Sequence, residues 1–329
     1  VAMKTKPVLL PFCWIVTLLF FAMELQALPP QELPRADKKI RVQPADTLKA
    51  QLGEGAIWNP LRKTLFWVDI TGQRLYELLP ARRICNRWDF DMPVSTVVPE
   101  TDSTVVIALQ NRIERFNLNS RQRDTIARIN DKGGRLRCND GKCDPAGRLW
   151  IGTMAYDGAT DEGTLYSVEA DGQVTVQIGS VTISNGIVWT ADRSTMYYID
   201  TPTRQVSRYR YDEASGRISF EEVSIIVPEA WGSPDGMTID RDGKLWIAHW
   251  GGHGVYQWDP DSGELIRRIG VPAPNVTSCA FGGDQLDTLY ITTAACSAAD
   301  SAQYPLSGSL FVCKPGVRGA TPLLFGKKN

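Results

Sequence analysis

The strongest constraint on the fold is an aromatic or β-branched strand that recurs about every 45 residues. The equivalent strand positions are Phe66, Val106, Trp150, Tyr197, Trp246 and Tyr290. They are separated by 40, 44, 47, 49 and 44 residues, with turn-forming Gly, Asp and Pro between them and no long helical period past residue 50. Such a period is typical of a ring of four-stranded sheets. The sequence therefore predicts an all-β fold, a six-bladed β-propeller with four-stranded blades.

A ring of this kind closes when one strand from the start of the chain joins the last blade. Residues 39–42 (KIRV) precede the first full repeat and are the candidate for that outer strand. A β-sandwich or two separate β domains are the alternatives, but neither predicts one period across residues 54–313. Residues 39–329 are therefore expected to form a single propeller domain.

The first 27 residues have the pattern of a secretory signal peptide. Two lysines precede an apolar run at residues 7–23, and the segment ends on the small residue Ala27. Cleavage there would export the protein to the periplasm or the medium, with no membrane contact afterwards. A retained membrane anchor is the alternative. Residues 28–38, which are rich in proline and charge, are expected to form a linker.

Composition limits the chemistry that the chain can perform. The 36 basic and 37 acidic residues give a net charge of −1, so nothing favours nucleic acid as a partner. The only histidines are His249 and His253, which excludes a His-rich zinc site and argues against His-dependent nucleophilic catalysis. Both are expected to have structural or rim roles. No P-loop, G-x-S-x-G or C-x-x-C motif occurs, so carboxylates, amides and hydroxyls must carry the chemistry.

A polar residue lies eleven or twelve positions before each of the six strand positions. These residues are Glu54, Ser95, Asn139, Asn185, Asp235 and Ser278. Equivalent positions of a radial repeat occupy equivalent places around the axis, so the six side chains are expected to form a ring where the innermost strands begin.

Glycine follows several of these positions, as in Asn185-Gly186 and Asp235-Gly236, and would let a ligand approach the backbone. Ordinary hairpin turns are the alternative for any one of them. A ring of side-chain oxygens without histidine or thiolate suits a hard divalent cation. Glu54 and Asp235 would neutralise its charge, and Asn185 would add a carbonyl oxygen.

Five segments resemble the SMP-30/gluconolactonase/LRE family. They are residues 53–58 (GEGAIW), 137–148 with 152–154, 183–186 with 197–200, 234–248, and 277–283. The similarity spans roughly residues 50–300. It implies a six-bladed propeller with one divalent metal near the axis, and hydrolysis of a sugar lactone such as gluconolactone as the activity.

The resemblance also implies roles for individual residues. Glu54, Asn185 and Asp235 would bind the metal, with Asp235 also transferring the proton. The substrate would be held by Arg137 and Asn139, with Asp157 as a further contact, although the loop after Asp157 is shorter than usual. The cation could be Ca²⁺, Mg²⁺, Mn²⁺ or Zn²⁺, since this oxygen set accepts all four.

Two features depart from the family pattern. Cys138 and Cys143 stand where apolar residues are usual, which hints at a disulfide suited to an exported protein; two buried free thiols are the alternative. The leader is the second departure, because several familiar members are cytosolic.

Two other functions remain open at this stage. One is a non-catalytic propeller that binds a metal or another ligand. The other is an arylesterase or phosphotriesterase, which would be favoured if tryptophans line the mouth. The tryptophans concerned are Trp58, Trp189, Trp231 and Trp250, and blade packing is the alternative for Trp58 and Trp189.

Overall fold

The computed structural model describes residues 1–2 and 32–327. Glu32–Asn329 form one compact unit. The signal peptide expected over residues 1–27 lies almost wholly outside the described residues, so export stays a prediction. In the part of the chain that the structure describes, no helix is long and apolar enough to cross a bilayer.

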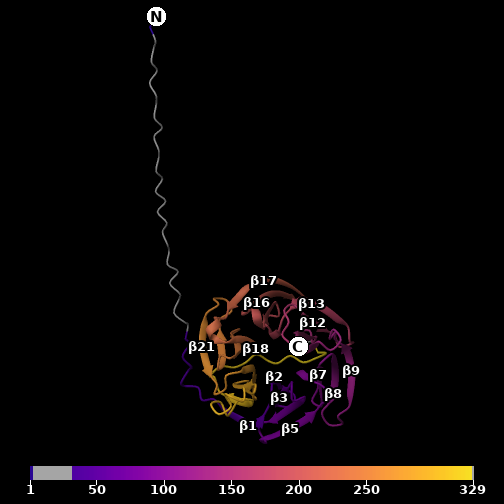
Figure 1. The fold of residues 1–329 in the computed structure, drawn as a ribbon. Helices are drawn as coiled ribbons and strands as arrows, with labels where there is room; N and C mark the ends of the chain where they lie inside the picture. The colour runs from indigo at the N-terminus through magenta and orange to yellow at the C-terminus, as the bar shows by residue number, and fades with distance from the viewer. Residues whose placement is uncertain (3–31, 328–329) are drawn as a thin grey trace. The chain divides into compact units, whose positions relative to one another are not determined.

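Six four-stranded antiparallel sheets are arranged radially around an axis, which confirms the six-bladed propeller (Figure 1). The first three blades, from the axis outward, are β2 (Gly53–Asn59), β3 (Thr64–Asp69), β4 (Arg74–Leu79) and β5 (Ile84–Asp89); β6 (Val94–Pro99), β7 (Thr104–Leu109), β8 (Arg112–Asn117) and β9 (Arg123–Arg128); and β10 (Leu136–Cys143), β11 (Leu149–Ala155), β12 (Gly163–Val168) and β13 (Val174–Val181).

The other three blades are β14 (Ser184–Trp189), β15 (Thr195–Asp200), β16 (Gln205–Asp212) and β17 (Arg217–Ile226); β18 (Ser233–Ile239), β19 (Leu245–Trp250), β20 (Gly254–Trp258) and β21 (Leu265–Gly270); and β22 (Val276–Gly282), β23 (Thr288–Thr293), β24 (Ser309–Cys313) and β1 (Gln43–Lys49). Two short 3₁₀ turns, η1 (Thr201–Thr203) and η2 (Glu229–Trp231), are the only helices among the described residues.

The N-terminal segment closes the ring, as expected, but with a different strand. β1 pairs with β24 in antiparallel register, Gln43 opposite Val312 and Lys49 opposite Ser309. The prediction that residues 39–42 form the closing strand is therefore wrong, because that strand begins at Gln43. The reason is a turn at Asp37, whose carboxylate accepts a hydrogen bond from the Lys39 backbone N–H at 2.9 Å.

The inner strands carry continuous apolar runs because neighbouring blades cover both faces of each sheet. All six residues of β3 are buried, and five of the six in β7. Strands at the outer rim, such as β17, are mostly exposed. This gradient from hub to rim explains why the aromatic second strands gave the clearest repeat in the sequence.

The expected link between Cys138 and Cys143 is wrong. Both thiols are buried, and all described cysteines are free. The two residues belong to the same strand, β10. Five residues of extended chain span about 16 Å, whereas a disulfide needs Cα atoms within about 7 Å of each other. Each thiol instead fills space in the apolar core.

The closing strand can be tested by truncation. A chain beginning at Ala50 lacks β1 and leaves β24 as an unpaired edge, so we expect a thermal unfolding midpoint lower by several degrees and concentration-dependent aggregation. A chain beginning at Glu32 retains β1 and is the control. Equal midpoints and equal solubility for the two chains would contradict the closure.

Candidate metal centre

All six innermost strands depart from regular pairing at the same level of the ring. The register shifts fall between Glu54 and Ile57, Val94 and Thr96, Cys138 and Gly141, Ser184 and Ile187, Pro234 and Met237, and Val276 and Ser278. A β-bulge bends the strand and re-aims its side chains, often next to a functional site. The six expected ring residues lie in or directly beside these bulges. They are therefore not in hairpin turns.

The glycines of the bulges serve the packing of neighbouring strands. A Cβ atom at Gly186 would lie 2.6 Å from the Met237 Cβ, and one at Gly236 would lie 2.7 Å from the Ser278 Oγ. Only glycine permits these approaches without movement of a neighbour. These two glycines thus bring the inner strands together, and the expected role in admitting a ligand stays a prediction.

Hydrogen bonds join the polar side chains of the third and fourth blades. Arg137 Nη1 donates to Asn139 Oδ1 at 2.6 Å. Asn139 Nδ2 donates to the Ser184 carbonyl oxygen at 2.7 Å and to Asn185 Oδ1 at 3.3 Å. All three side chains are at least nine-tenths buried. The amide of Asn139 thus holds Arg137 and Asn185 in place.

The chain of hydrogen bonds continues to the fifth blade. Asn185 Nδ2 donates to Thr201 Oγ1 at 2.7 Å, and that hydroxyl donates to the Pro234 carbonyl oxygen at 2.8 Å. Pro234 directly precedes Asp235. Because its Nδ2 is held by Thr201, the Asn185 amide has a fixed orientation, and its Oδ1 is the atom left to bind a cation.

Glu54 and Asp235 are brought together in the buried hub. Their exposed fractions are 7% and 5%. Burial, together with the negative charge of Asp140, raises the pKa of Glu54 to about 8. Burial and the charge of Glu54 hold the pKa of Asp235 well above its usual range. Two carboxyl groups this close disfavour each other's ionisation.

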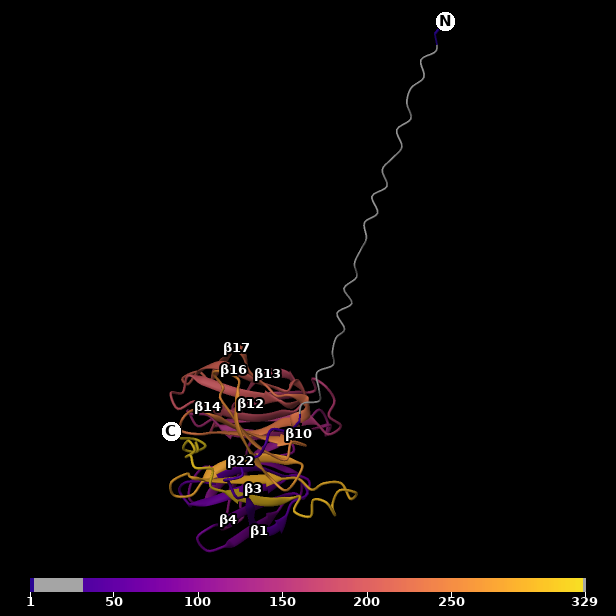
Figure 2. The same ribbon diagram turned by 90° about the vertical axis from the view of Figure 1, so that its left-hand side faces the viewer.

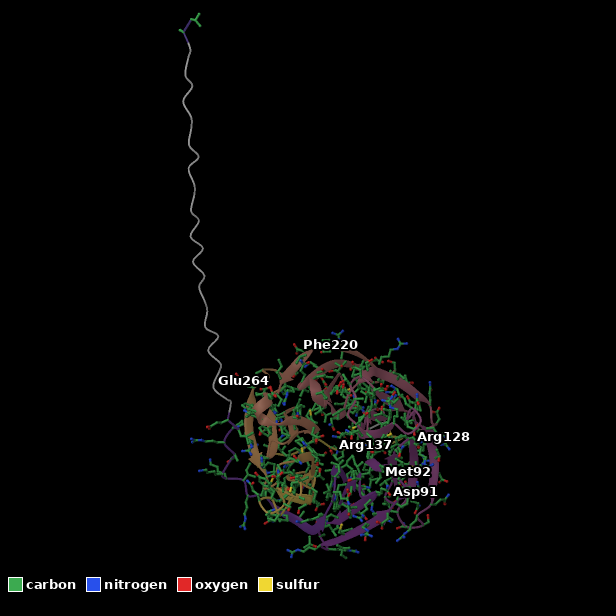
Figure 3. All side chains as sticks on the ribbon, viewed as in Figure 1. Asp91, Met92, Arg128, Arg137, Phe220 and Glu264 are labelled. Carbon is green, nitrogen blue, oxygen red and sulfur yellow. The ribbon has the colours of Figure 1, made fainter. Side chains whose placement is uncertain are left out.

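Arg137 is the positive charge nearest to these carboxyl groups. Its charge lowers the pKa of both Glu54 and Asp235, but less than burial raises them. Burial in turn lowers the pKa of the Arg137 guanidinium. In Figure 3 Arg137 lies near the middle of the ring, whereas Arg128 and Phe220 lie at its outer edge.

The donor set fits a hard divalent cation. Asp235 Oδ1 is buried and has no hydrogen-bond partner among the described residues, which is a costly arrangement unless something else binds the oxygen. The described residues contain no cluster of three or more His, Cys, Asp or Glu side chains suited to a metal. The assignment of the Asn185 amide oxygen as a third ligand therefore stays a prediction of the ring pattern.

The remaining predicted residues take different places. Ser95 Oγ donates to the Cys138 carbonyl oxygen at 2.6 Å and so joins the second blade to the third. Asp157 lies apart from the hub on an exposed loop, where its carboxylate accepts a hydrogen bond from the Ala159 N–H at 3.1 Å. Its neighbour Tyr156 is 51% exposed.

Sequence reasoning missed two residues that shape this centre. Asp140 is buried and raises the pKa of both Glu54 and Asp235. Its position in the sequence Asn-Asp-Gly resembles a turn, and only the bulge in β10 turns it towards the hub. Thr201, which holds Asn185, lies in η1, outside the inner strands, where the repeat gives no signal.

The histidines and tryptophans are mostly structural. His249 is fully buried, stacks on Tyr256 with ring centroids 3.7 Å apart, and has a pKa lowered by burial to about 3. Trp58 and Trp189 are buried in the blades, and Trp231 packs on Tyr256. Trp231 is half-buried, whereas Trp250 is exposed, at 41%.

Comparison with known proteins agrees with this geometry. Residues 52–295 match the SMP-30/Gluconolactonase/LRE-like region. The chain belongs to this family. It is 38% identical over 283 residues to the putative sugar lactone lactonase YvrE of Bacillus subtilis, covering 85% of this chain and 97% of the relative.

Two further family members are similar over most of their length. The pentonolactonase XacC of Haloferax volcanii is 41% identical over 249 residues, covering 74% of this chain and 82% of the relative. The crystal structure of regucalcin from Agrobacterium tumefaciens, described as a calcium-binding protein, superposes with a TM-score of 0.83 at 28% identity, covering 87% of this chain and 97% of the other.

The raised pKa of Glu54 predicts a pH dependence of stability in protein treated with chelator. The folded state holds the proton more tightly than the unfolded state, so the free energy of unfolding falls as pH rises from about 4.5 to about 8. Glu54→Gln removes this loss, and we expect it to raise the free energy of unfolding by at least about 1 kcal/mol near pH 8. Chemical denaturation across this pH range measures both effects.

Glu77→Gln is the matched control for this prediction. Glu77 is also buried, but it accepts hydrogen bonds from Arg62 Nε at 2.7 Å and Thr64 Oγ1 at 2.9 Å. Its replacement is expected to lower the free energy of unfolding by about 1–3 kcal/mol. If both variants destabilise equally, Glu54 is an ordinary structural carboxylate.

Proposed function

We propose that the protein hydrolyses sugar lactones, aldonolactones such as gluconolactone, with a divalent cation held by Glu54, Asn185 and Asp235. The observation that carries this proposal is the buried Asp235 Oδ1, which has no hydrogen-bond partner among the described residues although a second carboxyl group, that of Glu54, interacts with it. The lactonase names of the relatives from Bacillus subtilis and Haloferax volcanii support the substrate class.

A cation bound there would polarise the lactone carbonyl and lower the pKa of a nearby water. Asp235 accepts the proton of the attacking water as the new carbon–oxygen bond forms. When the ring carbon–oxygen bond breaks, Asp235 returns that proton to the leaving alkoxide, and the product is the open hydroxy acid. A carboxyl group whose pKa is raised by burial above its usual range suits both steps.

Arg137 and Asn139 position the substrate in different ways. The guanidinium of Arg137 stabilises the negative charge that develops on the carbonyl oxygen. Asn139 acts through its hydrogen bonds, since it fixes Arg137 at 2.6 Å and contacts Asn185. Asp157 is not assigned a role, because its side chain faces its own loop.

A non-catalytic metal-binding propeller is the second candidate. The amide of Asn139 favours it, because both Nδ2 protons are used within the hub and only Oδ1, which already accepts from Arg137, is left for a sugar hydroxyl. This candidate predicts stabilisation by a divalent cation without turnover of any lactone. Aryl esters belong in the same screen, because two exposed aromatic residues lie beside the inner-strand starts: Tyr156 directly follows β11, and Trp250 is the last residue of β19.

The catalytic role predicts that Asp235→Ala lowers kcat/KM for gluconolactone by roughly 10²- to 10⁴-fold. Chelator should abolish the activity, and Ca²⁺, Mg²⁺, Mn²⁺ or Zn²⁺, added one at a time, should restore it to different extents. Glu264→Gln, an exposed residue at the outer edge of the ring (Figure 3), is the control. Activity that is indifferent to both chelator and Asp235→Ala rules out this mechanism.

Thr201 is expected to act as a positioning residue. Thr201→Val removes the hydroxyl that holds Asn185 Nδ2, and we expect cation affinity to fall about 10- to 100-fold, as measured by calorimetry. Thr203→Val is the control, because that hydroxyl lies in the same turn and contacts only the backbone of Asp200 and Gln205 among described residues. Equal affinities for the two variants would show that Asn185 needs no such support.

A further inference from the structure

A cavity of about 580 Å³ lies at the other end of the inner strands from the metal centre. Its wall includes Ile57, Val188 and Thr238, each three residues further along the strand from Glu54, Asn185 and Asp235. The volume is within the range of small-molecule binding pockets. The proposed lactonase chemistry makes no use of this space.

The floor of the cavity is apolar and aromatic. Trp58, Trp189 and Phe281 line it, and each is at most 6% exposed. Trp189 also carries an unused donor, since its Nε1–H is buried without a hydrogen-bond partner among the described residues. An apolar surface with a few polar groups is the usual lining of a site for an organic ligand.

The charged side chains of the cavity are all basic. Lys142, Arg193 and Arg241 line it, and no acidic residue does. Lys142 Nζ donates to the Met237 carbonyl oxygen at 2.6 Å, and Arg193 pairs with Glu213 at 3.0 Å. Arg241 is exposed at the rim and makes no side-chain hydrogen bond or ion pair with a described residue. It is therefore available to an anion.

The C-terminal segment forms one wall. Residues 320–323 line the cavity, and the segment crosses the ring in Figure 1 and ends at one face of it in Figure 2. Backbone hydrogen bonds hold both sides of this wall, from Ala320 to Ile239 and from Phe325 to Pro99. The segment thus encloses an apolar chamber that has basic groups at its rim.

We propose that this cavity binds an amphipathic monoanion, a medium-chain alkyl carboxylate. The alkyl chain lies against Trp58, Trp189 and Phe281, and the carboxylate pairs with Arg241. This assignment uses the apolar floor, the absence of acidic side chains in the lining, and the unpaired arginine together. It is independent of the lactonase proposal, because no residue of the metal centre lines the cavity.

Decanoate, decanol and the fluorescent anion anilinonaphthalene sulfonate are the probes. The full-length protein should bind the dye saturably with one-to-one stoichiometry, and decanoate should displace it. Decanol has a similar chain without the charge and should bind at least about 10-fold more weakly. Absence of saturable dye binding, or equal potency of decanol and decanoate, overturns the proposal.

Two variants locate the site. Arg241→Gln should weaken decanoate binding about 10-fold, while Arg128→Gln, an exposed arginine on outer strand β9, should leave it unchanged. Thr321→Trp places a bulky ring on the exposed part of the C-terminal wall and should abolish dye displacement. Thermal unfolding and lactone turnover are measured on each variant to confirm folding.

These readouts separate the two proposals. If Thr321→Trp binds decanoate with the wild-type affinity and has an unchanged unfolding midpoint, the ligand binds elsewhere and the inference is overturned. An equal effect of Arg241→Gln and Arg128→Gln does the same. Failure of lactone turnover in the wild-type protein leaves the decanoate result intact, since the two measurements depend on opposite ends of the inner strands.

Discussion

The burial of two carboxyl groups, those of Glu54 and Asp235, is the constraint around which the hub is organised, because burial is the main cause of the raised pKa of each. Two other buried carboxylates, those of Asp69 and Asp240, have donors of their own. Asp69 accepts backbone N–H groups of Gln51, Leu52 and Gly72, and Asp240 accepts the indole N–H of Trp246 at 2.8 Å. The same chain leaves Asp235 Oδ1 without a hydrogen-bond partner in the part that the structure describes. Local departures from good hydrogen bonding are expected where function needs them.

The bulges explain how six separate strands present polar atoms to one axis without losing the sheet. A regular strand would alternate its side chains between the two faces of the blade, both of which are packed against apolar neighbours. Each register shift lets one or two residues leave that alternation and face the channel. The freed side chains also tie blade to blade, as Thr277 Oγ1 does with the Gly53 carbonyl oxygen at 2.5 Å. The features that build the site therefore also close the ring.

The sequence was sufficient for the blade number, the ring of polar residues and the family, because each depends on a pattern that repeats with the fold. It was insufficient where an outcome depends on one local contact. The closing strand begins after the turn that Asp37 makes, so residues 39–42 are not part of it. Cys138 and Cys143 looked like a pair because the strand between them contains Asn-Asp-Gly, which favours turns in isolation. Asp140 faces the hub only through the bulge that tertiary packing imposes there.

The metal centre and the cavity depend on the same strands, and β10 carries charge towards both. Asp140 lies in its bulge and acts on Glu54 and Asp235, while Lys142, two residues further, lines the cavity. Lys142 and Asp140 also act on each other electrostatically, since each shifts the pKa of the other towards its charged form. In a buried channel such interactions are weakly screened. The charges of Asp140 and Lys142 therefore partly offset each other within β10.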